Sequence, residues 1–202
     1  MRLTATQRIL GLLLMLFSTT MLPPVLIALA FNDGEAMAFL YGFAANLAAG
    51  LIIWFPVRKE NRDLRLRDGF LVVAAFWVVL GTFGAAPFLF SSQPSMSVTD
   101  AVFEAVSGLT TTGATVLSGL DELPLSILYY RQQLQWLGGM GIIVLAVAVL
   151  PMLGVGGMQL YRAETPGPVK DTKLTPRITE TAKALWYIYL GLTVMCALGY
   201  WL

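Results

Sequence analysis

The chain has 202 residues, of which 57% are hydrophobic and 12% charged, and its formal net charge is +1. These values lie outside the range of soluble globular domains and indicate a polytopic membrane protein. At about 20 residues per spanning helix, the chain has room for roughly five or six crossings. The near-neutral charge gives no sign of nucleic-acid binding, and a single cysteine, Cys196, excludes an intrachain disulfide.

Two uncharged runs predict a leading pair of transmembrane helices within residues 1–57. The first extends from Ile9 to Asn32, and its Pro23-Pro24 pair predicts a kink or an early end. A secretory signal peptide is the alternative interpretation, because the N-terminus is basic, but no Ala-x-Ala-like cleavage site follows. The second run extends from Ala36 to Val57. Each run is long enough to cross a membrane as a helix.

Three further runs predict three more spans: Gly69 to about Phe90, about Trp136 to about Leu150, and Leu185 to Leu202. The last of these is barely long enough to cross a membrane. We therefore expect this sequence to be the N-terminal part of a longer protein. Asn46 is a lone polar group in the second span, and we expect it to form an interhelical hydrogen bond.

The basic residues predict the orientation of the chain. With a cytoplasmic N-terminus, 12 of the 13 Lys and Arg residues fall on the cytoplasmic side, as the positive-inside rule requires. Most of them lie in two loops, residues 58–68 and 154–184. Arg131 alone falls outside, close in sequence to Asp121 and Glu122, and we expect it to pair with them or to snorkel.

A short helix is predicted between the third and fourth spans. Ser97 and Asp100 fit a capping box, which predicts a helix over residues 98–109. Such a helix extends about 18 Å, too short for about 30 Å of hydrocarbon, so this segment must enter the membrane and turn back. We expect Asp100 and Glu104 to lie near its wet N-terminal end, where the helix dipole favours negative charge.

Residues 110–115, Thr-Thr-Thr-Gly-Ala-Thr, follow that helix and are predicted to bind a cation. Carbonyl and hydroxyl oxygens can replace the water around an alkali ion without a fixed charge that would trap it. We predict that Thr111, Thr112 and Gly113 coordinate K+, with Gly113 permitting the required backbone angles. The flanking candidates are Thr110, Ala114 and Thr115. The alternative is an ordinary polar re-entrant loop or a Gly-capped helix end.

Three stretches resemble the TrkH branch of the TrkH/TrkG/KtrB potassium uptake family. They are AVFEAVSGLTTTGAT at 101–115, YRQQLQWLGGMGI at 130–142 and LPMLGVGG at 150–157. The resemblance covers essentially the whole chain. It implies an all-α membrane protein with four repeats of outer helix, pore helix, filter and inner helix, preceded by two additional helices.

The resemblance also implies a division of the chain, which would supply one of four filter strands. The expected parts are two leading transmembrane helices (1–57), a basic cytoplasmic loop (58–68), a first pore repeat (69–153), a cytoplasmic loop (154–184) and the truncated first helix of a second repeat (185–202). The pore repeat contains a span, the re-entrant pore helix 98–109, the filter 110–115 and a second span. Gly138, Gly139 and Gly141 open that second span, where we favour close helix packing over gating.

The function implied by the resemblance is K+ translocation across the bacterial inner membrane. The implied partners are membrane lipid, a peripheral nucleotide-binding subunit of the TrkA kind and, for the full-length protein, a second copy in a homodimer. The alternative function is a nonconducting scaffold or assembly fragment whose loop 154–184 docks a cytoplasmic regulator. An enzyme is not expected, because the chain lacks His, intramembrane acid pairs and a Ser or Cys with a base.

Overall fold

The structure is a computed structural model that describes residues 3–58, 66–149 and 174–201. All regular elements in these ranges are helical, and they fall into two units, residues 1–138 and 139–202. Four described segments are long and apolar enough to cross a membrane. They are Leu3–Phe31, Ala36–Val57, Leu71–Phe90 and Glu180–Trp201. An all-α, multi-pass fold was expected and is confirmed, whereas most of the predicted loops 58–68 and 154–184 lies outside the described residues.

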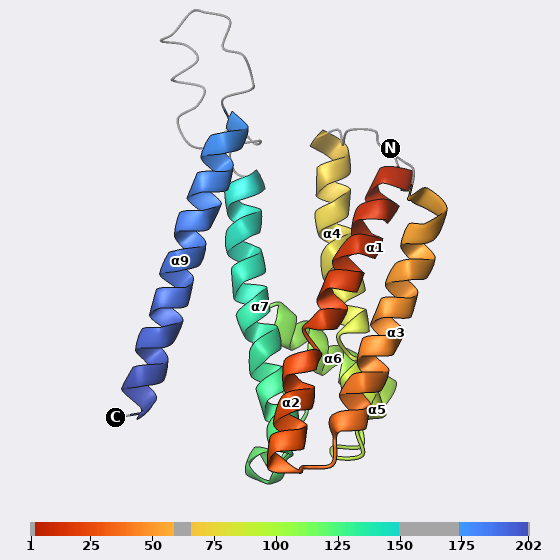
Figure 1. Ribbon diagram of the computed structural model, residues 1–202, viewed down its shortest axis with the longest axis vertical. Coiled ribbons are helices and arrows are strands. Elements are labelled where there is room, and N and C mark those ends of the chain that lie inside the picture. The colour runs from red at the N-terminus through yellow and green to blue at the C-terminus, as the bar shows by residue number, and fades with distance from the viewer. Residues whose placement is uncertain (1–2, 59–65, 150–173, 202) are drawn as a thin grey trace, which may run out of the picture. The chain divides into compact units, whose positions relative to one another are not determined.

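The first unit is a bundle in which the leading helices pack against the first helix of the predicted repeat. It contains α1 (Leu3–Thr19), α2 (Leu22–Phe31), α3 (Ala36–Trp54) with its extension η1 (Phe55–Val57), α4 (Leu66–Phe83) and α5 (Ala86–Phe90). Helix α1 packs against α3 and α4, side by side in Figure 1. The buried cluster includes Leu14, Phe17, Phe39 and Phe88.

A proline pair divides the first predicted span into α1 and α2. Pro24 has no N–H, so the carbonyl of Thr20, four residues earlier, loses its helical donor. Gln133 supplies a replacement, because its Nε2 donates to the Thr20 oxygen over 2.8 Å. The predicted break at Pro23-Pro24 is therefore present, and a side chain from a distant part of the sequence satisfies the carbonyl that it frees.

The third span is divided in the same way, between α4 and α5. Pro87 deprives the carbonyl of Phe83 of its donor, and the Nδ2 of Asn46 on α3 donates to that oxygen over 3.1 Å. Asn46 is fully buried and donates also to the Gly42 carbonyl over 2.8 Å. The predicted interhelical hydrogen bond of Asn46 is confirmed, and its purpose is to complete a helix that proline interrupts.

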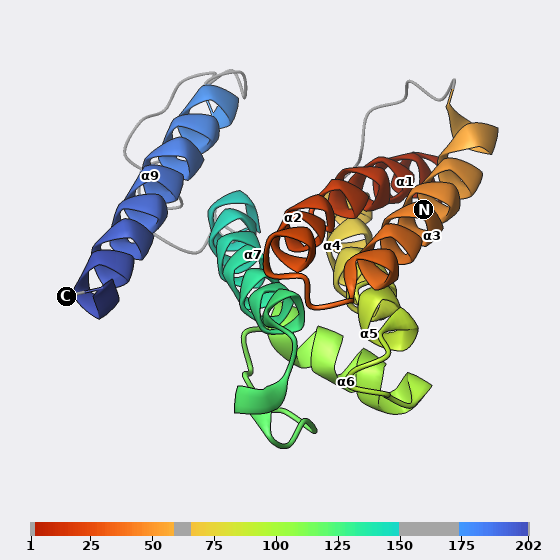
Figure 2. The same cartoon turned by 60° about the horizontal axis from the view of Figure 1, so that its bottom comes forward.

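Two more helices complete the first unit. Helix α6 (Val98–Leu109) lies beside the lower part of the bundle in Figure 1 and close to α5 in Figure 2. The short η2 (Leu120–Glu122) leads to α7 (Leu125–Val149), whose N-terminal part belongs to this unit. Tyr130 of α7 is buried between the rings of Phe39 and Phe88, and its hydroxyl donates to the Gly84 carbonyl over 2.9 Å.

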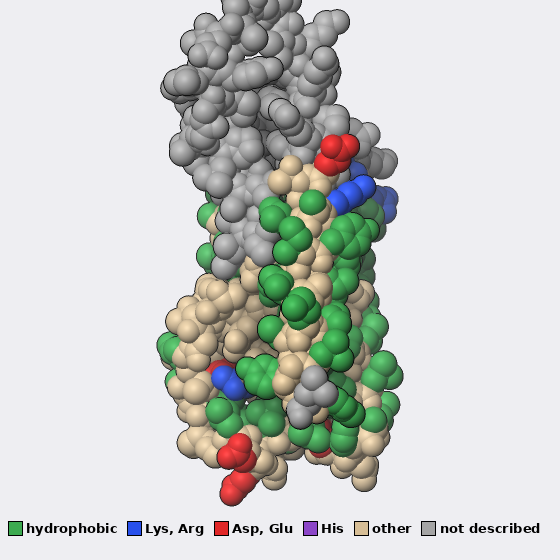
Figure 3. Space-filling model, turned by 90° about the vertical axis from the view of Figure 1, so that its left-hand side faces the viewer, with side chains coloured by type: hydrophobic (Ala, Val, Ile, Leu, Met, Phe, Trp, Pro, Cys, Tyr) green, Lys and Arg blue, Asp and Glu red, His purple; other side chains and the backbone are tan. Residues whose placement is uncertain are grey.

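Two helices are longer than the uncharged runs within them. Helix α7 begins at Leu125, whereas we expected a span from near Trp136, and the uncharged run begins only after Arg131. The described helix of the second unit, α9, spans Leu174–Trp201, and the predicted span from Leu185 is its C-terminal part. Apolar side chains such as Tyr187, Leu192 and Leu198 are exposed on α9, and green side chains cover that helix in Figure 3.

Candidate ion-binding site

The short helix α6 is positioned by hydrogen bonds at its N-terminus. The backbone N–H of Asp100 donates to the Oγ of Ser97 over 3.2 Å, and the Ser97 hydroxyl donates to the Asp100 carboxylate over 2.7 Å. These bonds satisfy an N–H that has no partner within the helix. The predicted helix over 98–109 and its capping residue are both confirmed.

The loop before α6 is tied to the leading helices by a buried carboxylate. Glu35 is 3% exposed and accepts hydrogen bonds from the N–H groups of Ser92 and Gln93 and from the Ser92 hydroxyl. Asp33 performs a similar task for α7, since its Oδ2 accepts from the N–H of Ser126 over 2.9 Å. Acidic residues before α3 therefore fix the entrances to both α6 and α7.

The chain reverses direction directly after α6. The N–H groups of Thr110 and Thr112 donate to the carbonyls of Val106 and Ser107 over 2.8 and 3.0 Å. Thr111 and Gly113 then have φ values of +59° and +74°. Glycine adopts this left-handed conformation without the steric cost that a Cβ imposes, so Gly113 fits the role that the sequence assigned to it.

The carbonyl oxygens of Thr111, Thr112 and Gly113 have no hydrogen-bond donor within the described part of the chain. All three residues are exposed. Backbone carbonyls at membrane depth require a partner, which protein, water or an ion can provide. These three oxygens are therefore free to bind a ligand, and they follow a helix C-terminus that carries partial negative charge.

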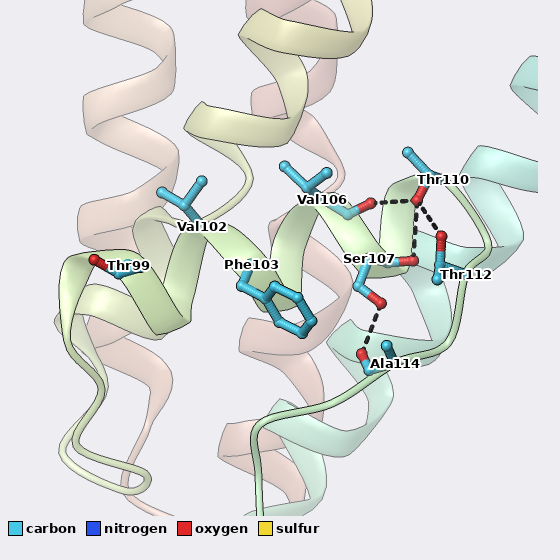
Figure 4. Close-up of a pocket in the computed structure, with 8 residues that line it drawn as sticks. All are labelled: Thr99, Val102, Phe103, Val106, Ser107, Thr110, Thr112 and Ala114. Carbon is cyan, nitrogen blue, oxygen red and sulfur yellow. Dashed lines mark hydrogen bonds between the residues drawn. The ribbon is translucent and has the colours of Figure 1, made fainter.

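The flanking residues hold this segment against α6. The hydroxyl of Ser107 donates to the Ala114 carbonyl over 2.6 Å, and the hydroxyls of Thr110 and Thr112 lie 2.8 Å apart. Figure 4 shows these side chains around a groove of about 410 Å³, to which Val102, Phe103 and Val106 contribute the apolar wall. Because its own hydroxyl is engaged by Thr110, Thr112 offers the site chiefly its carbonyl oxygen.

Next to the segment lies an ion pair that differs from the sequence prediction. Glu104 is 3% exposed and not at a wet helix end, and its Oε1 lies 2.5 Å from the Nε of Arg131. Arg131 is itself buried and does not pair with Asp121 or Glu122, both of which are exposed. The prediction was wrong because both residues are buried, and a charge in the protein interior requires an opposite charge and fixed hydrogen bonds.

Glu104 also anchors the strand that leaves the candidate site. Its carboxylate accepts from the Thr115 hydroxyl over 2.9 and 3.1 Å and from the N–H of Val116 over 3.2 Å. The flanking candidate Thr115 therefore binds protein through its hydroxyl. One carboxylate joins α6, the strand after Gly113 and α7.

A second contact between α6 and α7 lies at the end of the short helix. A Cβ atom on Gly138 would overlap the carbonyl oxygen of Leu109, the last residue of α6. Only a residue without a side chain allows the two backbones to approach this closely. The expectation of close packing at Gly138 is confirmed.

Sequence reasoning missed the pairing of Glu104 with Arg131, although the helical period contains a signal. Arg131 lies four residues after Ile127 and three before Leu134, and both of these are buried. Glu104 is adjacent to Ala105 and three residues after Ala101, which are buried too. Each charged residue therefore lies on the apolar face of its helix, and two such residues of opposite sign are natural partners.

The carboxylates of the described residues do not form a site of the kind that divalent metals use. Within those residues, no group of three or more His, Cys, Asp or Glu side chains could hold a metal ion. The oxygen atoms of residues 110–115 are all uncharged carbonyls and hydroxyls. Such ligands suit a monovalent cation better than a divalent one.

Comparison with known proteins gives consistent matches over the whole chain. The family profile described as "TrkH: Cation transport protein" matches residues 35–202. The "Trk system potassium uptake protein TrkH" of Vibrio parahaemolyticus is 65% identical over 96% of this chain and 40% of its own length. The TrkH of Escherichia coli is 62% identical over 100% of this chain and 42% of its own length, and TrkG of the same organism is 44% identical over 94% and 39%.

A solved structure matches as well. The crystal structure of the potassium transporter TrkH from Vibrio parahaemolyticus superposes with a TM-score of 0.84 at 56% identity, covering 100% of this chain and 40% of that one. This chain thus spans about two fifths of the length of these relatives. The family is one of transport proteins and not of enzymes. From the profile match and the relatives together, the chain belongs to the TrkH family of cation transport proteins.

Proposed function

We propose that this chain forms the N-terminal part of the membrane subunit of a potassium uptake system, in which Thr111, Thr112 and Gly113 supply one strand of a K+-selective filter. One observation carries the proposal: three consecutive exposed residues, whose carbonyl oxygens have no donor among the described residues, follow the C-terminus of α6. The names of the relatives, each a Trk system potassium uptake protein, support potassium as the ion.

The chemistry of these oxygens suits K+. Uncharged carbonyls can replace the hydration shell of the ion and still release it, whereas a carboxylate in the same place would bind it too tightly for passage. The carboxylate that binds the adjoining Thr115, that of Glu104, is buried and is neutralised by Arg131. The partial negative charge at the C-terminus of α6 adds further stabilisation for a cation.

A complete filter needs strands from several directions around one axis. In our proposal residues 69–153 form the first of four pore repeats, residues 1–57 precede it as two leading helices, and residues 185–202 open the second repeat. The open groove beside the filter strand, with its apolar wall of Val102, Phe103 and Val106, is consistent with a face that other repeats cover. This chain then supplies one strand of four.

The proposal includes the setting of the protein. The distribution of Lys and Arg supports a bacterial inner membrane protein with a cytoplasmic N-terminus, since 12 of the 13 then lie in the cytoplasm. A nucleotide-binding subunit of the TrkA kind would bind on that side, and the full-length protein would form a homodimer.

The test is a chimera in which residues 1–202 replace the matching part of TrkH from Vibrio parahaemolyticus. Uptake of K+ and Na+ into proteoliposomes is compared for the chimera and for Thr112→Val and Gly113→Ser. Gly113→Ser should reduce the preference for K+ over Na+ by at least about tenfold, which corresponds to a change of about 1.4 kcal/mol in relative binding. Thr112→Val keeps the carbonyl oxygen but removes the contact of its hydroxyl with Thr110, and it should reduce the preference by a smaller factor. Thr99→Val is the matched control, because Thr99 lines the groove but lies at the opposite end of α6.

The result separates the proposal from the scaffold alternative. If the chimera takes up K+ and both substitutions leave its preference unchanged, the filter assignment is wrong. Binding of a cytoplasmic regulator to loop 154–184 without any such change would then favour the nonconducting scaffold.

A further inference from the structure

The buried carboxylate of Glu104 lies at the centre of the contacts that hold the candidate filter. It accepts hydrogen bonds from the Nε of Arg131, the hydroxyl of Thr115 and the N–H of Val116, at 2.5 to 3.2 Å. These donors belong to α7 and to the strand that leaves the filter, and Glu104 belongs to α6. The side chain therefore connects the three segments whose relative placement determines where the filter carbonyls lie.

The strand is fixed to α6 at two neighbouring points. Ser107 and Glu104 lie three residues apart, on one face of the helix, and they bind Ala114 and Thr115 respectively. These attachment points lie one and two residues after Gly113. The N–H groups of residues 111–113 donate to carbonyls of α6, and the attachments at Ala114 and Thr115 add a second constraint on the direction of the carbonyls of residues 111–113.

The charge of the pair matters as much as its hydrogen bonds. Glu104 and Arg131 are 3% and 7% exposed, so an unpaired charge at either would be poorly screened. An unpaired carboxylate would attract cations to the nearby carbonyls, and an unpaired guanidinium would repel them. Because the two opposite charges cancel, the electrostatic potential at the filter is set mainly by the filter's own oxygen atoms.

We propose that Glu104 and Arg131 are positioning residues that set the ion selectivity of this filter strand, by fixing its exit at Thr115 and by cancelling each other's charge beside it. The inference rests on the proposed function and adds residues that do not touch the ion. If the pair were purely structural, its substitution would affect folding alone. If the pair positions the filter, its substitution changes which cation is preferred. The affinity for K+ then falls when the positive charge remains and rises when the negative charge remains.

The experiment uses the chimera described above with Glu104→Gln, Arg131→Gln and the double substitution. Glu104→Gln leaves a buried positive charge and should raise the K+ concentration for half-maximal uptake by about tenfold, whereas Arg131→Gln leaves a negative charge and should lower it by a similar factor. In the double variant, which retains polar groups without net charge, this concentration should return to within about threefold of the unsubstituted chimera. Shifts of the same sign in both single variants, or no shift, would overturn the inference.

A second series avoids any buried charge and so keeps the test independent of folding defects. Thr115 is exposed, and Thr115→Val removes the hydroxyl that donates to Glu104 and accepts from the N–H of Leu117, whereas Thr115→Ser keeps that hydroxyl. We expect the preference for K+ over Na+ to fall by about threefold, and Thr115→Ser to retain it, because removing a hydrogen bond to a charged group has an effect of this order or larger. The positioning role is contradicted if the preference for K+ over Na+ is the same in the unsubstituted chimera, in Thr115→Val and in Thr115→Ser.

The outcomes also separate this inference from the proposed function. A folded, unsubstituted chimera that does not take up K+ overturns both. An active chimera that loses K+ preference through Gly113→Ser but keeps it in every Glu104, Arg131 and Thr115 variant overturns the positioning role alone. Asp121→Asn, an exposed acidic residue, is the control that should change neither affinity nor preference.

Discussion

The two halves of the segment after α6 differ in how their polar groups are satisfied. In the first half, Thr111, Thr112 and Gly113 are exposed residues, and their carbonyls have no donor among the described residues. In the second half, residues 114–116 are bound by Ser107 and by Glu104, whose charge Arg131 neutralises. The same short segment thus combines a row of free carbonyl oxygens with a support that is hydrogen-bonded to α6.

This difference shows how an irregular segment can present fixed ligands. A row of ion-binding carbonyls needs oxygen atoms that accept no hydrogen bond from the protein. A backbone segment without any hydrogen bonds, however, has no fixed orientation. The structure resolves this conflict by fixing the row through the N–H groups of residues 111–113, which donate to carbonyls of α6, and through contacts one and two residues beyond Gly113. The paired half is therefore expected to carry most of the stability and to position the open half, which supplies the oxygens that face the ion.

The largest expected effect on stability comes from breaking the support at Arg131. Arg131→Met leaves Glu104 buried without its counter-charge, and it should reduce the free energy of unfolding by about 3–5 kcal/mol. Unfolding of the chain in mixed detergent micelles measures this change. Asp121→Asn and Glu122→Gln are the controls and should have no measurable effect. A large effect of either would indicate that Arg131 pairs with that residue, as the sequence predicted.

The next largest effect is expected where α6 and α7 approach most closely. Gly138→Ala places a methyl group against the carbonyl oxygen of Leu109, and the required backbone shift should cost about 2–3 kcal/mol. The same unfolding measurement applies. Gly191→Ala on α9 is the matched control, because no atom lies within 4 Å of its Cβ position, and a loss equal to that of Gly138→Ala would contradict the assigned contact.

A smaller effect is expected in the open half, at Gly113. A Cβ there meets no atom within 4 Å, so Gly113→Ala introduces only the conformational cost of a positive φ, about 1–2 kcal/mol. Gly113→Asn should cost less, because asparagine adopts left-handed angles more readily than alanine. If both variants lose the same stability, the loss is caused by the volume of the added side chain and not by the positive φ.

The smallest effect is expected at the start of α6. Ser97→Ala removes the capping hydroxyl, and it should reduce the free energy of unfolding by about 1 kcal/mol. Ser95→Ala changes an exposed serine in the same loop and should leave stability unchanged. If the two variants behave alike, the hydrogen bond at Ser97 does not contribute to the stability of α6.

The local features of the site could be predicted because each depends on neighbouring residues. Ser97 and Asp100 predicted the start of α6, the extent of residues 98–109 indicated its length, and Gly113 indicated the unusual backbone angles. The long-range contacts could not be predicted in the same way. Arg131 was expected outside the span, paired with Asp121 or Glu122 or snorkelling, yet it lies within α7 and is buried.

The amino-acid sequence by itself determined that this is a helical membrane protein, where most of its helices lie and which segment carries uncharged oxygens. Composition, uncharged run length and capping are local properties, so they can be read along the chain. Only the tertiary structure decided which groups satisfy one another: Gln133 with Thr20, Asn46 with Phe83 and Glu104 with Arg131. The physical reason is that burial removes water as an alternative partner, and the replacement comes from whichever helix packs nearby.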